Sequence, residues 1–378
     1  MKKAFLITTG TCYPHNTDSQ LIEAYLRNNG WTLSKKIKEA NLIIINTCAF
    51  IKKNENRAFE FIKKAQKEKR SDAEIIVTGC LPAINKVKLQ AVFNGITIGA
   101  NSLQEFNKLL NEKLRIQDVK YIGSTRFLRK NEYKHAEYFL RIGWGCHGKC
   151  SYCAVRFVFG KPRSRPIPDI LQEFNIAYDK GYRRFVLIAN DSGSYGEDLD
   201  TSIIDLLYKL CQKKRNCQFA LSHLTPDKLK EILPSLKKFI RLGRIWRINI
   251  PVESGSNRII QLMNRSYTVN DFKYCIEKLI GYNPNLEIKT DIIVGFPSET
   301  EQDFLDSLRL VEWLGRNNVW FQSLIYSPRP NTEASKLPGQ IDQRTKAIRI
   351  KRLKDLCSFS RILREKKLFK KLKRKIVA

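Results

Sequence analysis

Three closely spaced cysteines near the middle of the chain constrain the fold and chemistry more than any other feature. Residues 145–153 read Gly-Cys-His-Gly-Lys-Cys-Ser-Tyr-Cys, so three and then two residues separate Cys146, Cys150 and Cys153. This spacing lets one loop wrap an iron–sulfur cluster, whose ligands are cysteine thiolates. Because a cubane contains four irons, three thiolates leave one iron open for chemistry.

A zinc knuckle and a set of buried cysteines are the two alternatives. Structural zinc normally uses four ligands in two separated pairs, and no second pair follows here at the required distance. Cysteines that only fill a core would not cluster beside Gly, Lys and Ser. The spacing therefore favours the cluster.

Charge and cysteine content indicate the partner and the compartment. Lys and Arg outnumber Asp and Glu by 68 to 37 in 378 residues, which gives a net charge of +31 and indicates a polyanionic partner, with nucleic acid first. Ten cysteines without disulfide-like spacing favour a reducing compartment, so we expect a cytoplasmic protein. No apolar run is long enough to span a membrane, and the short apolar segment after Lys3 is typical of a first β-strand rather than a signal peptide.

Residues 1–113 alternate short apolar strands with amphipathic helices. This alternation predicts right-handed crossovers and a doubly wound parallel sheet. The expected strands are Ala4–Thr8, Leu42–Asn46, Glu74–Thr78 and Gly95–Ile98, and the expected helices are Asp18–Asn29, Lys52–Lys69, Asn85–Phe93 and Leu103–Leu110.

A cysteine follows three of these strands: Cys12, Cys48 and Cys80. Ligands of open α/β sheets bind at the carboxyl ends of the strands, so the three thiols should converge there. Any one of them could be an ordinary core cysteine. Three at equivalent positions predict a second cluster with three cysteine ligands.

A second alternating series follows a polar, basic linker at residues 114–135. Its six expected strands are Tyr138–Ile142, Arg184–Ile188, Gln218–Leu221, Trp246–Ile250, Glu287–Val294 and Trp320–Ile325. Six βα units are too few for a closed eight-fold barrel.

The loop from Cys146 to Cys153 resembles the cluster loop of radical S-adenosylmethionine (SAM) enzymes. Cys12 with its downstream Asn16 and Asp18, together with Asn-Thr-Cys48 and Thr-Gly-Cys80, is similar to the N-terminal domain of methylthiotransferases, which carries an auxiliary cluster. Asn16 and Asp18 are equally typical of a turn and helix cap.

The resemblance covers roughly residues 1–345 and implies a fold. We expect an α/β protein with a doubly wound N-terminal domain (1–113), a linker (114–135), a radical SAM partial (β/α)6 barrel (136–340) and a basic helical tail (341–378). Methylthiotransferases usually end in a small RNA-binding β-barrel, and no strand pattern for it follows Gln340. The tail offers instead a basic stretch, which we expect to bind RNA phosphates: Arg344, Lys346, Arg349, Lys351, Arg352, Arg364, Lys366, Lys367, Lys370, Lys371, Lys373, Arg374 and Lys375.

The resemblance also implies site residues. Tyr152 matches the position whose backbone lies against the adenine of SAM, and Asn190 lies where the family places polar groups near the amino end of SAM. Glu253 and Ser254 end the fourth strand as further SAM contacts, although family members commonly carry Gln where Glu253 stands.

Further segments match family motifs. They are Gly160-x-x-Arg163-Ser164-Arg165-Pro166, which braces the loop or contacts phosphate, Asp291–Thr300, which has Ser298 in place of a usual Gly, and Tyr326–Thr332, which has Asn331 in place of a usual Gly.

The implied activity is that of a methylthiotransferase with two 4Fe–4S clusters and SAM. Cys146, Cys150 and Cys153 are implied to hold the cluster that reduces SAM to methionine and a 5′-deoxyadenosyl radical, which removes hydrogen from an unactivated C–H bond. Cys12, Cys48 and Cys80 are implied to hold the cluster that presents or supplies sulfur.

The Asp191–Asp198 segment and the following Thr201-Ser202-Ile203 look closest to the branch that modifies N6-threonylcarbamoyladenosine beside the tRNA anticodon. The alternatives are isopentenyladenosine in tRNA, an aspartate of a ribosomal protein, and an RNA-binding protein with only structural clusters. The expected partners are the tRNA anticodon region and an electron donor such as a flavodoxin or ferredoxin. We expect the protein to be a monomer that does not associate with a membrane.

Overall fold

The computed structural model describes residues 2–10, 12–120, 136–213 and 216–356. The chain forms two compact units, and each has its own packing. The first unit contains residues 1–148, 153–222 and 327–332, and the second contains residues 149–152, 223–326 and 333–378. Among the described residues, no helix combines the length and the apolar character that crossing a bilayer would require.

The N-terminal part of the first unit is built on a five-stranded parallel sheet. Its strands lie in the order β2 (Thr32–Leu33), β1 (Lys3–Thr8), β3 (Leu42–Thr47), β4 (Glu74–Gly79) and β5 (Ile96–Gly99). Successive strand residues point to opposite faces. Thus Leu42 and Ile44 pack in one core, and Ile43 and Ile45 pack in another.

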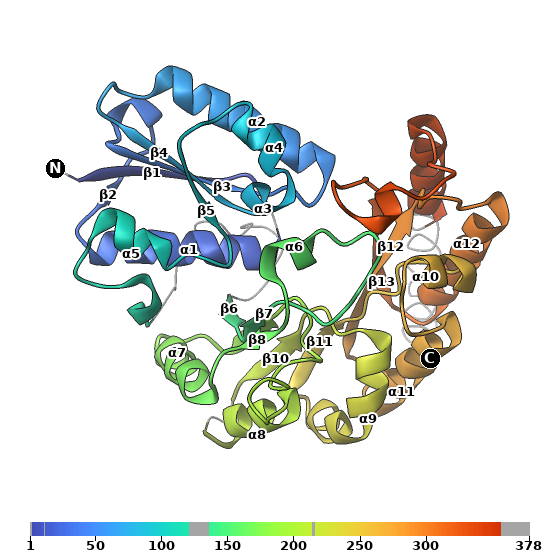
Figure 1. Ribbon diagram of the computed structural model, residues 1–378. Coiled ribbons are helices and arrows are strands. Elements are labelled where there is room, and N and C mark those ends of the chain that lie inside the picture. The colour runs from blue at the N-terminus through green and yellow to red at the C-terminus, as the bar shows by residue number, and fades with distance from the viewer. Residues whose placement is uncertain (1, 11, 121–135, 214–215, 357–378) are drawn as a thin grey trace, which may run out of the picture. The chain divides into compact units, whose positions relative to one another are not determined.

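Helices cover both faces of this sheet (Figure 1). One face packs against α1 (Tyr13–Asn28) and α5 (Glu105–Leu110), and the other against α2 (Lys52–Glu68), α3 (Leu81–Ile84) and α4 (Lys86–Gln90). The predicted doubly wound parallel sheet is confirmed.

Two details differ from the prediction. Helix α1 begins at Tyr13, directly after Cys12, so Asn16 and Asp18 lie inside the helix and not in a turn before it. The expected helix over Asn85–Phe93 is shorter than predicted, because α4 ends at Gln90, and the separate short helix α3 precedes it.

The first unit also holds the start of the second strand series. Strand β9 (Arg184–Ile188) pairs in parallel with β6 (Glu137–Arg141) and with β10 (Gln218–Leu221). The helices of this region are α6 (Val155–Phe159), α7 (Ile167–Asp179) and α8 (Ile203–Lys213). The short strands β7 (Gly143–Trp144) and β8 (Arg163–Ser164) pair antiparallel on either side of the cysteine loop.

The second unit continues the series. Strand β12 (Glu287–Val294) pairs in parallel with β11 (Ile245–Asn249) and with β13 (Trp320–Ile325). The helices are α9 (Pro226–Arg241), α10 (Asn257–Leu262), α11 (Val269–Tyr282) and α12 (Glu301–Arg316). Short 3₁₀ turns complete the described elements of the chain at Ile37–Glu39, Ile116–Asp118 and Glu333–Ser335.

Both α11 and α12 begin with a capping box, through Thr268 with Asp271 and Thr300 with Asp303. In each, the threonine side chain and the acidic side chain satisfy backbone N–H groups of the first turn. All six predicted strands are present, and their ends agree within one residue.

A helix over residues 343–356 begins the predicted basic tail. Lys346 and Arg349 are buried in it, against the expectation that they contact RNA. The Lys346 ammonium donates to the Tyr326 carbonyl, and Arg349 pairs with Glu299 at 2.6 Å. Arg344, Lys351 and Arg352 are exposed, and the tail residues from 357 onward lie outside the described part of the chain.

Candidate functional site

The carboxyl ends of three adjacent strands carry the N-terminal cysteines. Cys48 and Cys80 directly follow β3 and β4, and Cys12 lies four residues beyond β1 as the residue before α1. The Cys48 amide donates to the Thr9 hydroxyl at 2.9 Å, and its sulfur accepts from Asn54 at 3.3 Å. Sheet topology therefore gathers three thiols from distant parts of the sequence, as predicted.

The electrostatics of these thiols fit a cationic iron centre. Although Cys12 keeps an accessible side, desolvation by its surroundings, with the charge of Cys48, raises its pKa to about 12. Burial, with the charges of Cys48 and Cys12, raises the pKa of Cys80 well above its ordinary value. The thiols are thus close enough to oppose one another's ionisation, and a bound cation is what stabilises thiolates in such a site.

Arg141, at the end of β6, holds the helix that follows Cys12, and sequence reasoning missed it. Its guanidinium donates to the Pro14 carbonyl, to the Thr17 hydroxyl at 2.6 Å and to the Asp18 carboxylate at 2.7 Å. Arg141 and Asp18 are both buried. Asp18, which belongs to the motif that resembles methylthiotransferases, therefore ties α1 to Arg141 of β6. Through α1, this ion pair helps to fix the position of Cys12.

The first unit shapes the start of the central cysteine loop. Gly145 has φ +76°, and a Cβ there would lie 2.0 Å from the Lys161 carbonyl oxygen, so only glycine fits. The Gly145 amide donates to Asn190 Oδ1 at 3.0 Å, and the Cys146 amide donates to the Gly160 carbonyl at 3.2 Å. Of the two roles considered for the Gly160–Pro166 motif, these contacts support bracing of the loop.

Residues 149–152 of the loop belong to the second unit, which anchors them. Cys150 is buried, and the next residue, Ser151, donates through its amide to Met263 and through its hydroxyl to Leu262. Tyr152 follows and donates its hydroxyl to Glu253 at 2.7 Å. Several hydrogen bonds thus fix the position of the backbone between the second and third cysteines.

Glu253 and Arg265 form a buried ion pair beside Tyr152. Arg265 donates to Glu253 at 2.5 Å and to the Tyr152 hydroxyl at 2.6 Å. Burial raises the pKa of Tyr152 well above its ordinary value, so the hydroxyl stays protonated and donates. Glutamate in place of the usual glutamine thus supplies the charge that Arg265 requires.

Glu253 also has a left-handed backbone, with φ +67°. Its amide donates to Asp291 at 2.9 Å, and its carbonyl accepts from Ile293 at 2.8 Å, so the strained residue is fixed against β12. Ser254 is fully buried, and its hydroxyl accepts from the Ser256 amide and contacts Ser307. The roles of Asn190, Tyr152, Glu253 and Ser254 in binding SAM stay predictions.

Two residues that replace a usual family glycine adopt the conformation that glycine favours. Asn331 has φ +65° and Ser298 has φ +64°. Asparagine tolerates this region well, so Asn331 can take the place of the usual glycine. Of the four cysteines outside the two sets, Cys217 and Cys275 are buried, Cys211 is half-buried, and Cys357 lies outside the described residues.

Among the described residues, no three His, Cys, Asp or Glu side chains are placed to ligate one metal ion. The assignment of the two cysteine sets to clusters therefore stays a prediction from their spacing and from their positions at the carboxyl ends of the strands.

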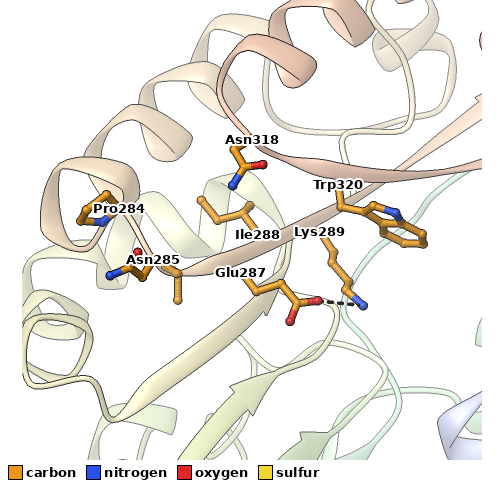
Figure 2. A pocket seen from close by; sticks show the side chains of 8 residues that line it. Pro284, Asn285, Glu287, Ile288, Lys289, Asn318 and Trp320 are labelled. Atoms are coloured by element: carbon orange, nitrogen blue, oxygen red, sulfur yellow. Dashed lines mark ion pairs between the residues drawn. The ribbon is translucent and has the colours of Figure 1, made fainter. Parts of the chain in front are cut away.

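A hollow of about 450 Å³ lies at the amino ends of β12 and β13. Figure 2 shows Trp320 beside Lys289, whose ammonium pairs with Glu287. The family-like motifs, in contrast, lie at the carboxyl ends of the strands. The hollow is therefore separate from the cysteine loop and its anchors.

Comparison with known proteins agrees with this arrangement. The family described as the radical SAM superfamily matches residues 140–311, and the uncharacterized protein family UPF0004 matches residues 3–99. Among solved structures, the radical SAM methyltransferase TsrM from Kitasatospora setae is similar in fold, with a TM-score of 0.62 at 11% identity over 89% of this chain and 77% of that chain. The predicted radical SAM fold is thus confirmed.

Two relatives are similar over nearly the whole chain. Both are named tRNA-2-methylthio-N(6)-dimethylallyladenosine synthase. The protein of Moorella thermoacetica is 31% identical over 94% of this chain and 82% of its own length, and that of Alkaliphilus oremlandii is 32% identical over 93% and 77%. Enzymes of this kind use 4Fe–4S clusters and SAM, as the resemblance implied. The chain therefore belongs to the radical SAM methylthiotransferase family.

Proposed function

We propose that this enzyme methylthiolates N6-dimethylallyladenosine in tRNA. The observation that carries the proposal is the match to relatives with that named activity over more than nine-tenths of the chain. The sequence alone favours N6-threonylcarbamoyladenosine, through the Asp191–Asp198 segment, with isopentenyladenosine, another name for N6-dimethylallyladenosine, as the alternative. The net charge of +31 supports a nucleic-acid substrate in either case.

In this proposal Cys146, Cys150 and Cys153 hold one cluster, and Cys12, Cys48 and Cys80 hold the other. When bound, the first supplies the electron for reductive cleavage of SAM and the second supplies or presents sulfur. The chain's own contribution is positional. Gly145 and Ser151 fix the backbone around Cys146 and Cys150 through the hydrogen bonds described above.

The Tyr152–Glu253–Arg265 group keeps the loop charge-balanced. Arg265 is largely buried, with a side-chain exposure of 12%, and the carboxylate of Glu253 neutralises it, so the group adds no net charge beside Cys150. A buried ion pair that also accepts a tyrosine hydroxyl is satisfied only in one geometry. The ion pair therefore fixes the position of Tyr152. In the family that the loop resembles, the backbone of this residue lies against the adenine of SAM.

The test uses anaerobically reconstituted enzyme, SAM, a reductant and tRNA that carries one of the two modified adenosines. We expect mass spectrometry of the digested tRNA to show the 2-methylthio derivative of N6-dimethylallyladenosine. A product only with the threonylcarbamoyl tRNA would move the assignment to that nucleoside. SAM cleavage without any methylthio nucleoside would overturn the tRNA proposal.

Two cysteine variants assign the clusters. Cys150→Ala should halve the iron content from about eight per chain and abolish SAM cleavage. Cys48→Ala should also halve the iron but spare SAM cleavage, with loss of the methylthio product. Loss of SAM cleavage in a folded Cys48→Ala protein would contradict this division of roles.

A further inference from the structure

One face of the sheet in the second unit is unusually polar for a parallel sheet. Parallel sheets are normally covered by apolar packing on both faces. In β12, Ile288 and Ile292 face a buried side, whereas Glu287, Lys289 and Asp291 alternate with them on the opposite side. Figure 2 shows this for Glu287 and Lys289 on one side and Ile288 on the other.

Neighbouring strands extend this polar face. Asn249 of β11 is the register partner of Lys289, and Gln322 of β13 is the register partner of Asp291. Register partners in a sheet point to the same face. Gln322 is exposed, as is Trp320 on the same strand, so the face is open at β13.

Three side chains of this face have hydrogen-bonding groups available for a ligand. Asn249 donates to the Asp291 carboxyl, whereas Asn249 Oδ1 is buried and accepts no hydrogen bond from any described residue. The amide of Gln322 is exposed and lies on the same face, where a ligand can reach it. A buried acceptor without a donor costs about 1–3 kcal/mol, so a ligand N–H placed against Asn249 Oδ1 would recover that free energy.

The location ties these groups to the reaction. Asp291 accepts, through its backbone carbonyl, the amide of Glu253, whose side chain holds Tyr152. Glu253 and Arg265 also act electrostatically on the Asp291 carboxyl. Asp291 therefore lies between the anchored cysteine loop and the open polar face.

We propose that Asp291, Asn249 and Gln322 form a positioning site that binds the edge of the substrate adenine. This inference rests on the proposed function and names the residues that would present the base to the reaction. Adenine offers ring-nitrogen acceptors and an N6–H donor, and amide side chains are its usual partners. Asn249 Oδ1 accepts from N6–H, the Asp291 carboxylic acid donates to a ring nitrogen, and Gln322 contributes from the open side.

The charges around Asp291 set its protonation. Burial and the charge of Glu253 raise its pKa to about 7, against the hydrogen bond from Asn249 and the charges of Arg265 and Lys289. From β13 the facing residue is the neutral Gln322. Below pH 7 the protonated Asp291 side chain therefore donates a hydrogen bond. Above pH 7 it is a carboxylate, which repels the lone pair of a ring nitrogen.

The test measures binding separately from chemistry. The probe is an anticodon stem-loop RNA with N6-dimethylallyladenosine, compared with the same loop carrying an abasic nucleotide at that position. The holoenzyme should prefer the intact loop on the order of tenfold to hundredfold, and Asp291→Ala should remove most of that preference. Because the abasic comparison cancels phosphate contacts, it reports the base alone.

Asp291→Asn supplies the sharper control, since an amide donates at every pH. It should keep the preference for the base, and its preference should no longer fall as the pH rises from 6 to 8. Asp306→Asn, on the exposed side of α12, should behave as the wild type. A structural hydrogen bond to Asn249 could survive in Asp291→Asn, but it would not make the base preference of the wild type fall with pH and that of Asp291→Asn independent of pH.

Three outcomes overturn the inference. They are a wild-type enzyme that does not distinguish the abasic loop, an unchanged preference in Asp291→Ala, and a loss of RNA-independent SAM cleavage in Asp291→Asn, which would indicate a contact with SAM. A base preference that depends on Asp291 without any methylthio product would instead sustain this site and reject the proposed function.

Discussion

The ion pair between Arg141 and Asp18 provides the most direct test of how the fold positions the N-terminal cysteines. Arg141→Met keeps the length and apolar stem of the side chain but removes three hydrogen bonds, to Pro14, Thr17 and Asp18. Both partners of the ion pair are about 95% buried, with side-chain exposures of 5% and 4%. Removing one partner of a buried pair costs about 3–5 kcal/mol, because the other charge is left without compensation.

The cost should depend on pH, and the structure fixes its sign. Burial raises the pKa of Asp18 from 3.8 to about 6, and Arg141 opposes the rise. Because the pKa of this carboxyl is higher in the folded than in the unfolded state, the fold is more stable at low pH. As the pH rises from about 4 to about 6, roughly 3 kcal/mol of the free energy of unfolding is lost. At pH 8 Asp18 is ionised, and the positive charge of Arg141 compensates its buried negative charge. At pH 5 Asp18 is mostly protonated, so hydrogen bonds alone satisfy it.

We therefore expect Arg141→Met to destabilise by about 3–5 kcal/mol at pH 8 and by only about 1–3 kcal/mol at pH 5. Urea unfolding of the anaerobically purified enzyme at the two pH values measures this difference. Because Arg141 holds the first turn after Cys12, the variant should also lose iron from the N-terminal site first, with SAM cleavage retained.

Arg70→Met is the matched control. Arg70 makes a two-fold hydrogen-bonded pair with Asp72 at 2.8 Å, against 2.7 Å for Arg141 and Asp18, but both side chains of the Arg70 pair are about half exposed. Exposed pairs contribute at most about 1 kcal/mol. An equal cost for the two variants, or a cost for Arg141→Met that does not change with pH, would refute the reasoning.

Three further predictions follow from single contacts. Gly145→Ala should lose the central cluster and SAM cleavage but keep the N-terminal iron, because its Cβ would overlap the Lys161 carbonyl; normal iron content would contradict this. Lys346→Met should alter thermal stability but not tRNA affinity, because the ammonium is buried against Tyr326; weaker tRNA binding at unchanged stability would contradict the burial. Charge reversal of Lys370, Lys371 and Lys373, which lie outside the described residues, should weaken tRNA binding and reduce the slope of log K against log salt by about 0.7–0.9 per lost phosphate contact; an unchanged slope would leave the tail without an RNA role.

Local sequence patterns predicted the strands and the convergence of Cys12, Cys48 and Cys80. Short apolar runs that alternate with helical patterns are enough to predict the parallel strands. Because ligands bind at the carboxyl ends of parallel strands, the cysteines at those ends predict a common site. The short β2 was missed, because two residues are too few to show a period. The β7–β8 pair was missed for the same reason.

The residues that hold the sites in place could not be found in this way. Arg141 contacts Asp18 across 123 positions of sequence, and Arg329 forms a buried pair with Glu55 across 274. A single basic residue near the end of a strand belongs to no sequence pattern from which its partner could be predicted. From the net charge alone, such a residue is expected to contact solvent or RNA. Lys346 and Arg349 show the same error in the tail.

The buried pairs explain why a chain with so large a basic excess still keeps ordered sites. Glu55, Asp18, Glu253 and Glu299 each neutralise a buried arginine, so part of the positive charge is internal and serves folding. Phosphate contacts can come only from the exposed remainder, such as Arg344, Lys351 and Arg352. Net charge alone therefore overstates the RNA-binding surface, and variants that reverse exposed charges should change RNA affinity while variants of the buried arginines change stability and iron content.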